Sequence, residues 1–579
     1  MAGRTTLLAG MLVVVLLVVL LLVVLVAPPA LASSSSSPSP SSWQCCDDGA
    51  KATLEQERHE ALDGMRGDAA AAVPWCNFAQ KYTTSELVND AGRREQFIKD
   101  VMHAEGKFHQ SGIAYHPVTA MTFDGHLIDY ASGKLYPGGL HNFSSGAKDA
   151  QHLSILALGL DGQPRALAYL NSTLKQPVSI QDIQLHAMHL IDLKLTALEK
   201  WNASFPGYGG YLPWFSHTTN GDLVPAPGWS NPYRVPALDN GEFYWGLYAV
   251  EVALSTSSLP GAAPLAARCR RYLRLLQDNA ATIFLTHDGK TRWVSEIVDV
   301  TTVPTRSNYR GSGDYGDPFE GELFTWVLYW HAPWSKLNLS RDDLFLHKHS
   351  SLQAVNFTTS TGQPITVQRG FWFSSHEQWK LLMLPYLHLQ RVARVFANCE
   401  RARTVNSAEK RIPGLYACIN DVTNGSEAIP DYISYTGIPS IAMENSTMWR
   451  YDVVTPYAAF PTTLINETVG AAWYHTMLLP NRMQGPYGST EAININGTEI
   501  SPLLTWDAKS LTPLAFMGGV ADVVAKGLRR DNLYSSFLNV TSSYYASAFA
   551  TPLSGEHVPF ALPTATAPTT PLSPFTACR

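Results

Sequence analysis

The feature that most constrains the fold is a series of strongly apolar segments with helical periodicity, separated by long loops rich in Gly, Pro, Trp and Tyr. Short β-like runs such as "KTRWVSEIV" and "QPITVQRGF" do not alternate with these segments as parallel βαβ units require. Helices with so little polar surface are buried on two sides, as in an inner ring wrapped by an outer ring. The sequence therefore predicts a mostly α fold, a single large α/α toroid. The segments are residues 181–201, 242–256, 264–284, 318–331, 376–397, 466–478, 513–527 and 531–548.

This architecture also predicts where a functional site lies, because the inner helices of such a ring run parallel and their N-termini gather at one end. One local pattern recurs in "LDNGEFYWGLY", "GDPFEGELFTW" and "FSSHEQWKLL": a cap residue, an acid three positions later, and aromatics in the next turn. Helix capping explains each acid taken alone. The aromatic neighbours favour a sugar-binding surface, since sugar rings stack on aromatic rings. The pairs are Asp239 with Glu242, Asp317 with Glu320, and Ser374 with Glu377.

The second of these segments contains two glutamates, Glu320 and Glu322. Asp317 followed by Pro318 predicts a helix start, with Glu320 at the third position of a capping box. Glu322 points away from Glu320 at about 100° per residue and has no capping function. We therefore expect Glu322 to be the free carboxylate of the pair.

A further candidate acid, Asp507, lies in "LLTWDAKSLTPLAF". Thr512 and Pro513 predict a helix start, which leaves Asp507 in the preceding loop. Hydrolysis of a glycosidic bond needs one protonated carboxyl and one ionised carboxylate. Aromatic surroundings favour a protonated Glu322, and a polar loop favours an ionised Asp507. A turn role for Asp507 is the structural alternative.

The ends of the chain differ in composition from its middle. Residues 1–32 contain Arg4, an apolar run over 7–27 and an "ALA" site ending at Ala32, so we expect a signal peptide or a retained signal anchor. Residues 33–44 read as a Ser/Pro linker and 550–579 as a Pro/Thr-rich tail, with the catalytic toroid over 45–549. The net charge of −6, with no basic patch, argues against a nucleic-acid partner.

Sequons and cysteines agree with the secretory pathway. Cys578 beside the C-terminus suggests a tail tied back by a disulfide, and the seven cysteines allow up to three bridges with one thiol left over. We therefore expect a secreted or surface-anchored glycoprotein with disulfide bonding. The sequons are Asn142, Asn171, Asn202, Asn338, Asn356, Asn424, Asn445, Asn466, Asn496 and Asn539.

The blocks "GDPFEGELF", "FSSHEQWKLLMLPY" and "GPYGSTEAININGTEISPLLTWDAKSLTPLAFMGG" resemble the eukaryotic secreted endo-β-1,2-glucanases, a family of inverting glycoside hydrolases with an (α/α)6 barrel. The resemblance implies Glu322 as general acid, with Glu320 as the alternate, and Asp507 as general base. It also implies cleft positions that contact substrate and a base that reaches its water through a substrate hydroxyl. The implied substrate-binding residues are Trp245, His376, Trp379, Tyr487 and Glu491.

Three functions remain open from the sequence. The first is an endo-acting hydrolase that cleaves β-1,2-glucan to sophoro-oligosaccharides with inversion, working as a monomer without metal or organic cofactor and contacting membrane only through a retained anchor. The second is a polysaccharide lyase, or a glycosidase of another linkage, on the same toroid. The third is a non-catalytic glycan-binding surface protein. Fold likeness alone does not decide among them.

Overall fold

The computed structural model describes residues 76–174, 178–226, 233–311, 315–425, 428–565 and 571–579. The chain divides into two compact units, Met1–Ala69 and Ala70–Arg579, and every described residue belongs to the second. The predicted signal segment and the Ser/Pro linker lie outside the described residues. The predicted domain boundaries therefore stay a prediction.

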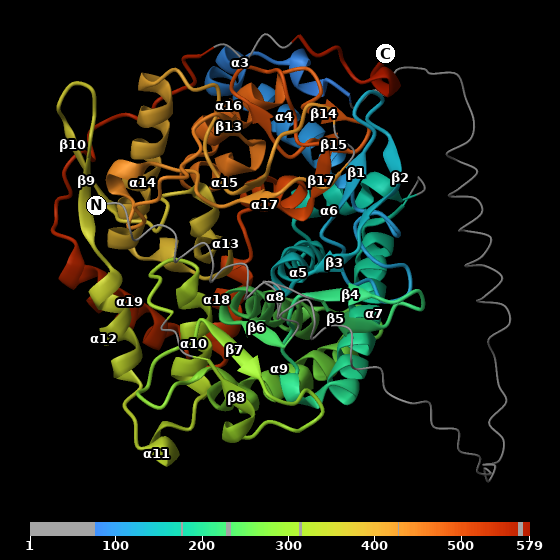
Figure 1. Ribbon diagram of the computed structural model, residues 1–579, viewed down its shortest axis with the longest axis vertical. Helices are drawn as coiled ribbons and strands as arrows, with labels where there is room; N and C mark the ends of the chain where they lie inside the picture. The colour runs from blue at the N-terminus through green and yellow to red at the C-terminus, as the bar shows by residue number, and fades with distance from the viewer. Residues whose placement is uncertain (1–75, 175–177, 227–232, 312–314, 426–427, 566–570) are drawn as a thin grey trace, which may run out of the picture. The chain divides into compact units, whose positions relative to one another are not determined.

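The described unit is a ring of helices in which outer and inner helices alternate along the chain (Figure 1). The inner helices follow one another by contact: α5 packs on α8, α8 on α10, α10 on α13, and α15 on α17, which returns to α5. The turn η6 (Ser375–Gln378) contacts both α13 and α15 and links these two helices. The predicted helical toroid is confirmed. The inner helices are α5 (Gly146–Leu160), α8 (Ala237–Thr256), α10 (Gly321–His331), α13 (Lys380–Met383), α15 (Phe460–Ile465) and α17 (Trp506–Phe516). The outer helices are α4 (Ala91–Gly106), α7 (Ile180–Ser204), α9 (Ala262–Phe284), α12 (Asp342–Ser351), α14 (Gln390–Glu409) and α16 (Glu467–Leu478).

The composition of each helix follows from its place in the ring. Helix α8 contacts α5, α9, α10 and α18, and nearly all of its side chains are buried. Helix α9 lies outside it and keeps charged residues on its outer face while Leu265, Leu273 and Leu276 point inward. A helix that is apolar all round is thus an inner helix, and one with an apolar stripe is an outer helix. Further helices are α3 (Thr84–Asn89), α6 (Pro164–Leu170), α11 (Trp334–Leu337), α18 (Ala521–Arg530) and α19 (Tyr534–Ala548).

Three small antiparallel sheets lead into inner helices. Strand β3 (Phe143–Ser144) precedes α5, β6 (Arg234–Pro236) precedes α8, and β17 (Leu503–Thr505) precedes α17. Their sheets have the orders β3-β4-β5, β6-β7-β8 and β17-β1-β2. The other members are β1 (Gly125–Ile128), β2 (Leu135–His141), β4 (Phe215–His217), β5 (Leu223–Pro225), β7 (Val294–Ile297) and β8 (Tyr309–Arg310).

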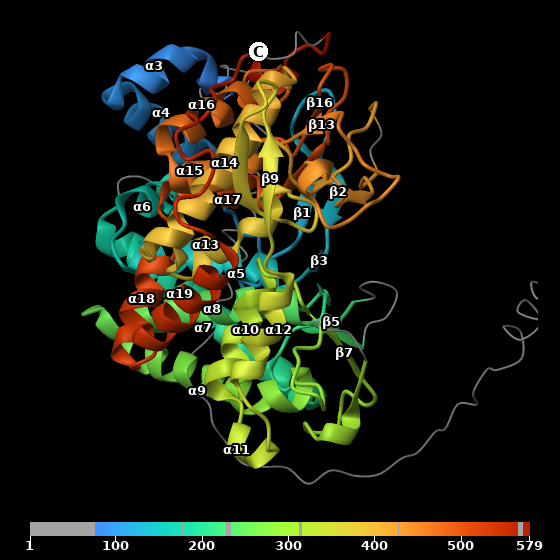
Figure 2. The same ribbon diagram turned by 90° about the vertical axis from the view of Figure 1, so that its left-hand side faces the viewer.

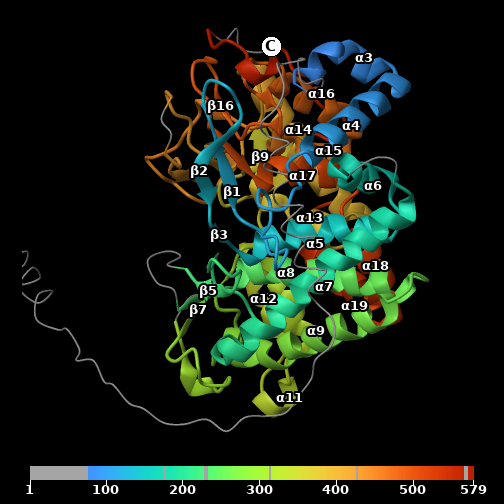
Figure 3. The same ribbon diagram turned by 90° about the vertical axis from the view of Figure 1, so that its right-hand side faces the viewer.

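These strands lie together on one side of the ribbon, opposite α6, α18 and α19 (Figures 2 and 3). Gly125 pairs with Thr505, and a Cβ at Gly125 would collide with the Leu504 carbonyl, so only glycine permits this approach of β1 to β17. The sheets therefore fix the N-terminal ends of the inner helices. The remaining strands are β9 (Ala354–Thr358), β10 (Pro364–Gln368), β11 (Ile419–Asn420), β12 (Tyr432–Ile433), β13 (Val453–Val454), β14 (Gln484–Gly485), β15 (Gly488–Ser489) and β16 (Ile493–Asn494).

Some predicted helix boundaries are wrong. The segment predicted as one helix over 376–397 is broken into η6 (Ser375–Gln378), α13, η7 (Tyr386–His388) and α14, because Pro385 cannot continue a helix. The segment predicted over 513–527 belongs to two helices, α17 and α18, with the turn Gly518 and Gly519 between them at positive φ.

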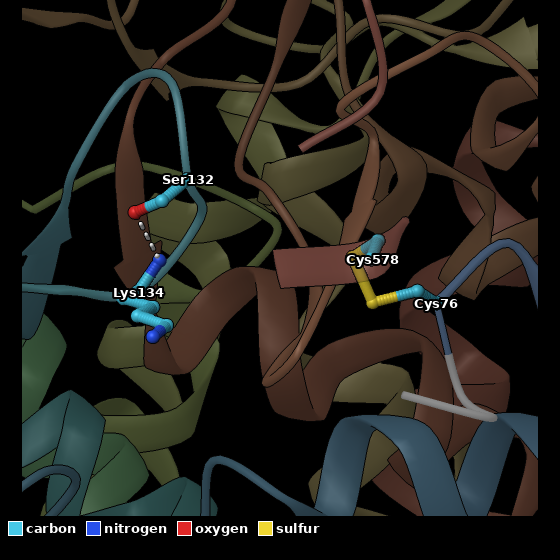
Figure 4. Close-up of a disulfide and its surroundings, with 4 residues drawn as sticks. All are labelled: Cys76, Ser132, Lys134 and Cys578. Carbon is cyan, nitrogen blue, oxygen red and sulfur yellow. Dashed lines mark hydrogen bonds between the residues drawn. A yellow bond between two sulfur atoms is a disulfide. The ribbon is translucent and has the colours of Figure 1, made fainter. Parts of the chain in front are cut away.

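The predicted tie of the tail is confirmed: Cys578 forms a disulfide with Cys76, and their Cα atoms are 5.5 Å apart (Figure 4). The bridge joins residues 502 positions apart. Of the other cysteines in the described ranges, Cys269, Cys399 and Cys418 are buried free thiols, so these ranges contain one bridge rather than three. Cys45 and Cys46 lie outside them.

Within the described ranges, no single helix is both long enough and apolar enough to cross a membrane. One bent pair, Trp506–Phe516 with Ala521–Arg530, meets the test by length and composition, with 69° between its two halves.

Candidate active site

The site forms where the N-terminal ends of the inner helices meet, as the toroid predicts. Helices α5, α8, α10 and α17 contribute their first turns, η6 precedes α13, and η9 (Pro456–Ala459) precedes α15. The carboxyls collected there influence one another's pKa values, which indicates that they lie close together. We call this group the carboxyl cluster. Its members are Asp239, Glu242, Asp317, Glu320, Glu377, Glu491 and Asp507.

Asp507 is the cluster member whose surroundings favour the ionised form. Burial opposes its ionisation and is the largest single effect, but the Lys148 ammonium, with help from His376, outweighs it and lowers the pKa of Asp507. Lys148 Nζ lies 2.5 Å from Oδ2, and Gln151 Nε2 donates to Oδ1 at 2.6 Å. Both contacts come from α5, so the packing of α5 on α17 holds a carboxylate that is charged at neutral pH.

The surroundings of Glu320 and Glu242 favour the protonated form instead. Burial and then the charges of Asp317 and Glu377 raise the pKa of Glu320 well above its usual range. Burial and then the charge of Glu320 do the same for Glu242. The Oε2 atom of each has no hydrogen-bond partner among the described residues. Glu320 is partly exposed, whereas Glu242 is 2% exposed, so of these two carboxyls Glu320 is the one that a substrate can reach.

The other cluster carboxyls are also held toward the protonated form. Burial raises the pKa of Asp239 to about 6, although Trp214 Nε1 donates to its Oδ2 at 3.0 Å. Burial raises the pKa of Glu377 to about 8 and that of Glu491 to about 7. Because like charges crowded together oppose one another's ionisation, these pKa values are raised, and that of Asp507, which faces Lys148, is lowered.

The prediction that Glu320 belongs to a capping box and that Glu322 is the free carboxylate is wrong. Helix α10 begins at Gly321, and Glu320 sits at its N-cap position without a side-chain capping hydrogen bond. Glu322 is 1% exposed, and its Oε2 accepts from Lys380 Nζ at 3.1 Å and from the Tyr386 hydroxyl. Glu322 is therefore half of a buried ion pair between α10 and α13, and Glu320 is the free carboxyl.

Asp507 lies in a helix rather than in the predicted loop. Helix α17 starts at Trp506, and the Thr505 hydroxyl caps it by accepting from the Ala508 amide. Pro513 is therefore inside the helix and removes the bond to the Lys509 carbonyl. The Tyr169 hydroxyl donates to that carbonyl at 3.3 Å instead, so the helix continues past the proline.

The predicted substrate-binding residues fall into two groups. His376 is partly exposed and acts on the charge of Asp507, and Glu491 belongs to the cluster, its Oε1 accepting from the Asn420 amide at 2.9 Å. Trp245 and Trp379 are each 1% exposed, so neither offers a ring face for stacking.

The positions of Trp245 and Tyr487 follow from the elements to which they belong. Trp245 Nε1 donates to the Leu323 carbonyl at 2.9 Å, which makes this tryptophan part of the packing between α8 and α10. Tyr487 is partly exposed in the turn between β14 and β15, four residues before Glu491. The expectation of stacking by Trp245 and Trp379 is thus wrong, because both fill the core.

The sequence analysis did not identify the residues that shift the pKa values of the cluster carboxyls. Lys148 and Gln151 lie on α5, a helix that the periodicity analysis did not detect. The Tyr457 hydroxyl is buried, has no partner among the described residues, and lies in range of the charges of Asp507 and Glu320. These residues carry no local motif, and only the toroid, which closes α17 against α5, could have indicated them.

A buried network supports the loop that carries Glu491. The Glu105 carboxylate of α4 accepts from the Ser489 amide at 3.0 Å, from the Tyr474 hydroxyl at 3.0 Å and from Lys509 Nζ at 3.1 Å. Lys509 belongs to α17, two residues after Asp507. The same network therefore fixes both the loop and the helix that supply cluster carboxyls.

The helical toroid and a cluster in which the pKa of Asp507 is lowered and that of the accessible Glu320 is raised together define a glycoside hydrolase of the general acid/base type. The family model described as Endo-beta-1,2-glucanase SGL matches residues 121–579, so the chain belongs to this family. The chain is an endo-acting glycoside hydrolase that cleaves β-1,2-glucan with inversion.

Solved structures agree with this membership. An endo-beta-1,2-glucanase from Talaromyces funiculosus in complex with sophorose is 38% identical, with a TM-score of 0.81 over 87% of this chain and 99% of that chain. A variant of the Talaromyces funiculosus enzyme in complex with beta-1,2-glucan is 37% identical, with a TM-score of 0.82 over 87% of this chain and 100% of that chain. A comparison with curated protein sequences found no match.

Proposed function

We propose that Glu320 is the general acid and Asp507 the general base for cleavage of β-1,2-glucan. Glu320 donates its proton to the glycosidic oxygen as the bond to C1 breaks. Asp507 takes a proton from the attacking water, directly or through a substrate hydroxyl, and the water oxygen bonds to C1 from the opposite face. The proton lost by Glu320 and the proton gained by Asp507 balance, and the product has the inverted configuration.

The division of charge in the cluster carries this proposal. Asp507 has a lowered pKa beside Lys148, while burial and neighbouring carboxyls raise the pKa of Glu320. Two carboxyls whose surroundings move their pKa values apart suit an acid and a base at the same pH. The partial exposure of Glu320 favours it over the buried Glu242 as the group that meets the glycosidic oxygen.

The test is to incubate the secreted chain with linear β-1,2-glucan and to follow the products by size and by optical rotation. Release of sophoro-oligosaccharides that appear first as the α-anomer supports both the substrate and the inversion. Products that appear first as the β-anomer contradict the assigned roles, because retention requires a carboxylate nucleophile. No release from this glucan contradicts the proposed substrate.

We also propose that the chain is exported, N-glycosylated and monomeric, with its N-terminal apolar segment removed. The disulfide between Cys76 and Cys578 supports an oxidising compartment. A loss of mass on treatment with an N-glycan-removing enzyme, and a monomer mass by light scattering, would support the proposal, and unchanged mass or a dimer would contradict it. The sequon asparagines with exposed side chains are Asn142, Asn338, Asn356, Asn424, Asn445, Asn496 and Asn539.

A further inference from the structure

A group of aromatic side chains lies at the surface near the carboxyl cluster. Trp372 is central: its ring centroid is 5.0 Å from that of Phe371, 6.2 Å from that of Tyr435 and 5.4 Å from that of Trp449. Trp449 and Tyr451 are 6.2 Å apart with their planes 7° from parallel. We call these five residues the aromatic strip. Phe371 is 43% and Tyr451 46% exposed, and exposed rings gathered in this way mark a binding surface.

The backbone under the strip is held firmly. Arg450 forms ion pairs with Asp421 and Asp452 at 2.8 and 2.7 Å, and its amide donates to the Tyr435 carbonyl at 3.0 Å. The Tyr416 hydroxyl donates to the Tyr451 carbonyl at 3.0 Å. A backbone held in this way loses little conformational entropy when a ligand binds, which favours a recognition surface over an incidental exposure of apolar groups.

One end of the aromatic strip adjoins the carboxyl cluster. The Trp372 amide donates to the carboxylate of Glu377, a cluster member that lies in charge range of Glu320. At the other end, Tyr451 lines a pocket of about 460 Å³ together with Tyr416 and Ile438. An extended ligand anchored at the cluster thus has a continuous set of contacts leading away from it.

We propose that the aromatic strip binds a distal stretch of the β-1,2-glucan chain, beyond the glucose units on either side of the bond that is cleaved. This inference rests on the proposed function, since an endo-acting enzyme must accommodate chain that extends past the cleavage point. Sugar rings present C–H faces that pack on exposed Trp and Tyr rings. The strip gives the enzyme a preference for long chains over short ones.

The test compares long and short substrates in the double variant W449A/Y451A. We expect its KM for long linear β-1,2-glucan to rise about tenfold, or about 1.4 kcal/mol of binding. Its kcat on the polymer, and both constants for a short oligosaccharide that fills only the cluster, should stay at the wild-type values. The matched control is W334A, which removes a partly exposed tryptophan from α11, and it should change neither KM.

The outcomes separate this inference from the proposed function. If the wild type does not cleave β-1,2-glucan at all, the proposed function fails. If the wild type cleaves it and W449A/Y451A keeps the wild-type KM for the polymer, the strip inference alone is wrong. An equal rise in KM for short and long chains also contradicts it, because the strip would then act at the cleavage point. Thermal unfolding of each variant checks that the comparison is made on folded protein.

A different occupant is available within the chain itself. Asn445 is an exposed sequon residue four positions before Trp449, so its own glycan could cover the strip. The variant N445Q removes that glycan. If the strip mutations affect the polymer KM only in the N445Q background, the strip is covered by the chain's own sugar, and the inference is overturned for the glycosylated enzyme. An effect in both backgrounds supports it.

Discussion

Replacing Glu320 with Gln tests the acid assignment most directly, because it keeps the shape of the side chain and removes the proton donor. General acid catalysis contributes about 10²- to 10⁴-fold to rate. We therefore expect kcat on β-1,2-glucan to fall by that factor, which is about 2.7 to 5.5 kcal/mol of activation free energy. Glu320 makes no side-chain capping bond, and its Oε2 lacks a partner among the described residues, so thermal stability should change little.

The neighbouring variant Glu322→Gln is a matched control with the opposite signature. Glu322 pairs with Lys380 in the core, where both side chains are at most 1% exposed. Removing one partner of a buried ion pair leaves the other charge uncompensated and costs about 3 to 5 kcal/mol of stability. E322Q should therefore unfold at lower temperature, while the folded fraction keeps a kcat near that of the wild type.

A substrate with a good leaving group sharpens the comparison. An aryl β-sophoroside whose phenol has a low pKa departs without protonation, so E320Q should recover most of its activity on it. D507N should not recover, because the water still needs a base. If E322Q loses kcat while E320Q keeps it, the reasoning from the buried ion pair is refuted. If E242Q shows the leaving-group pattern instead, Glu242 is the acid.

Three further predictions follow from the same contacts. Asp507 must be ionised to act, and Lys148 lowers its pKa, so K148M should move the acidic limb of the kcat/KM profile to higher pH, and an unmoved limb would count against this role. C578S opens the bridge to Cys76 and should cost about 5 kcal/mol of stability by loop-closure entropy with kcat retained, whereas a thermal midpoint unaffected by reductant would argue that the bridge does not form. Burial lowers the pKa of His109 to about 3, against about 6.5 when unfolded. The unfolded state thus binds more protons between these values, so the free energy of unfolding should fall as pH drops from about 6.5 toward 3. In urea titrations H109Q should reduce that slope, and an unchanged slope would disprove the contribution.

The fold was predictable because helices that are buried on all sides have very few polar residues. Segments such as 242–256 have almost no polar face, and only an inner helix wrapped by others can satisfy them. The same argument predicted that acidic residues gather at the N-terminal ends of the inner helices, where the carboxyl cluster lies. Boundaries were less predictable, because Pro513 reads as a helix start in sequence but is tolerated inside α17, where Tyr169 takes up the freed carbonyl.

The buried position of Glu322 was not predicted, because a local rule was applied where a tertiary contact decides. The capping-box pattern from Asp317 to Glu320 is genuine in sequence, but α10 starts one turn late, at Gly321. Glu322 pairs with Lys380, which lies 58 residues later in the chain, and no local sequence pattern indicates this contact. Buried tryptophans are misjudged for the same reason. The sequence around Trp245 suggests a ring that stacks on sugar, whereas the structure packs this side chain between α8 and α10.

The arrangement of the ring explains why so many carboxyls can be gathered at one place. Each inner helix presents its N-terminal end there, and the partial positive charge of a helix N-terminus stabilises nearby acidic groups. Both Asp507 and Glu320 lie at the N-terminal end of an inner helix, so this effect cannot by itself separate an acid from a base. The separation comes from one cation, Lys148, which reaches Asp507 from the adjacent helix, while Glu320 faces Asp317 and Glu377. A single lysine at the start of α5 thus lowers the pKa of Asp507, while burial and neighbouring carboxyls raise the pKa of Glu320 and Glu242 well above their usual range.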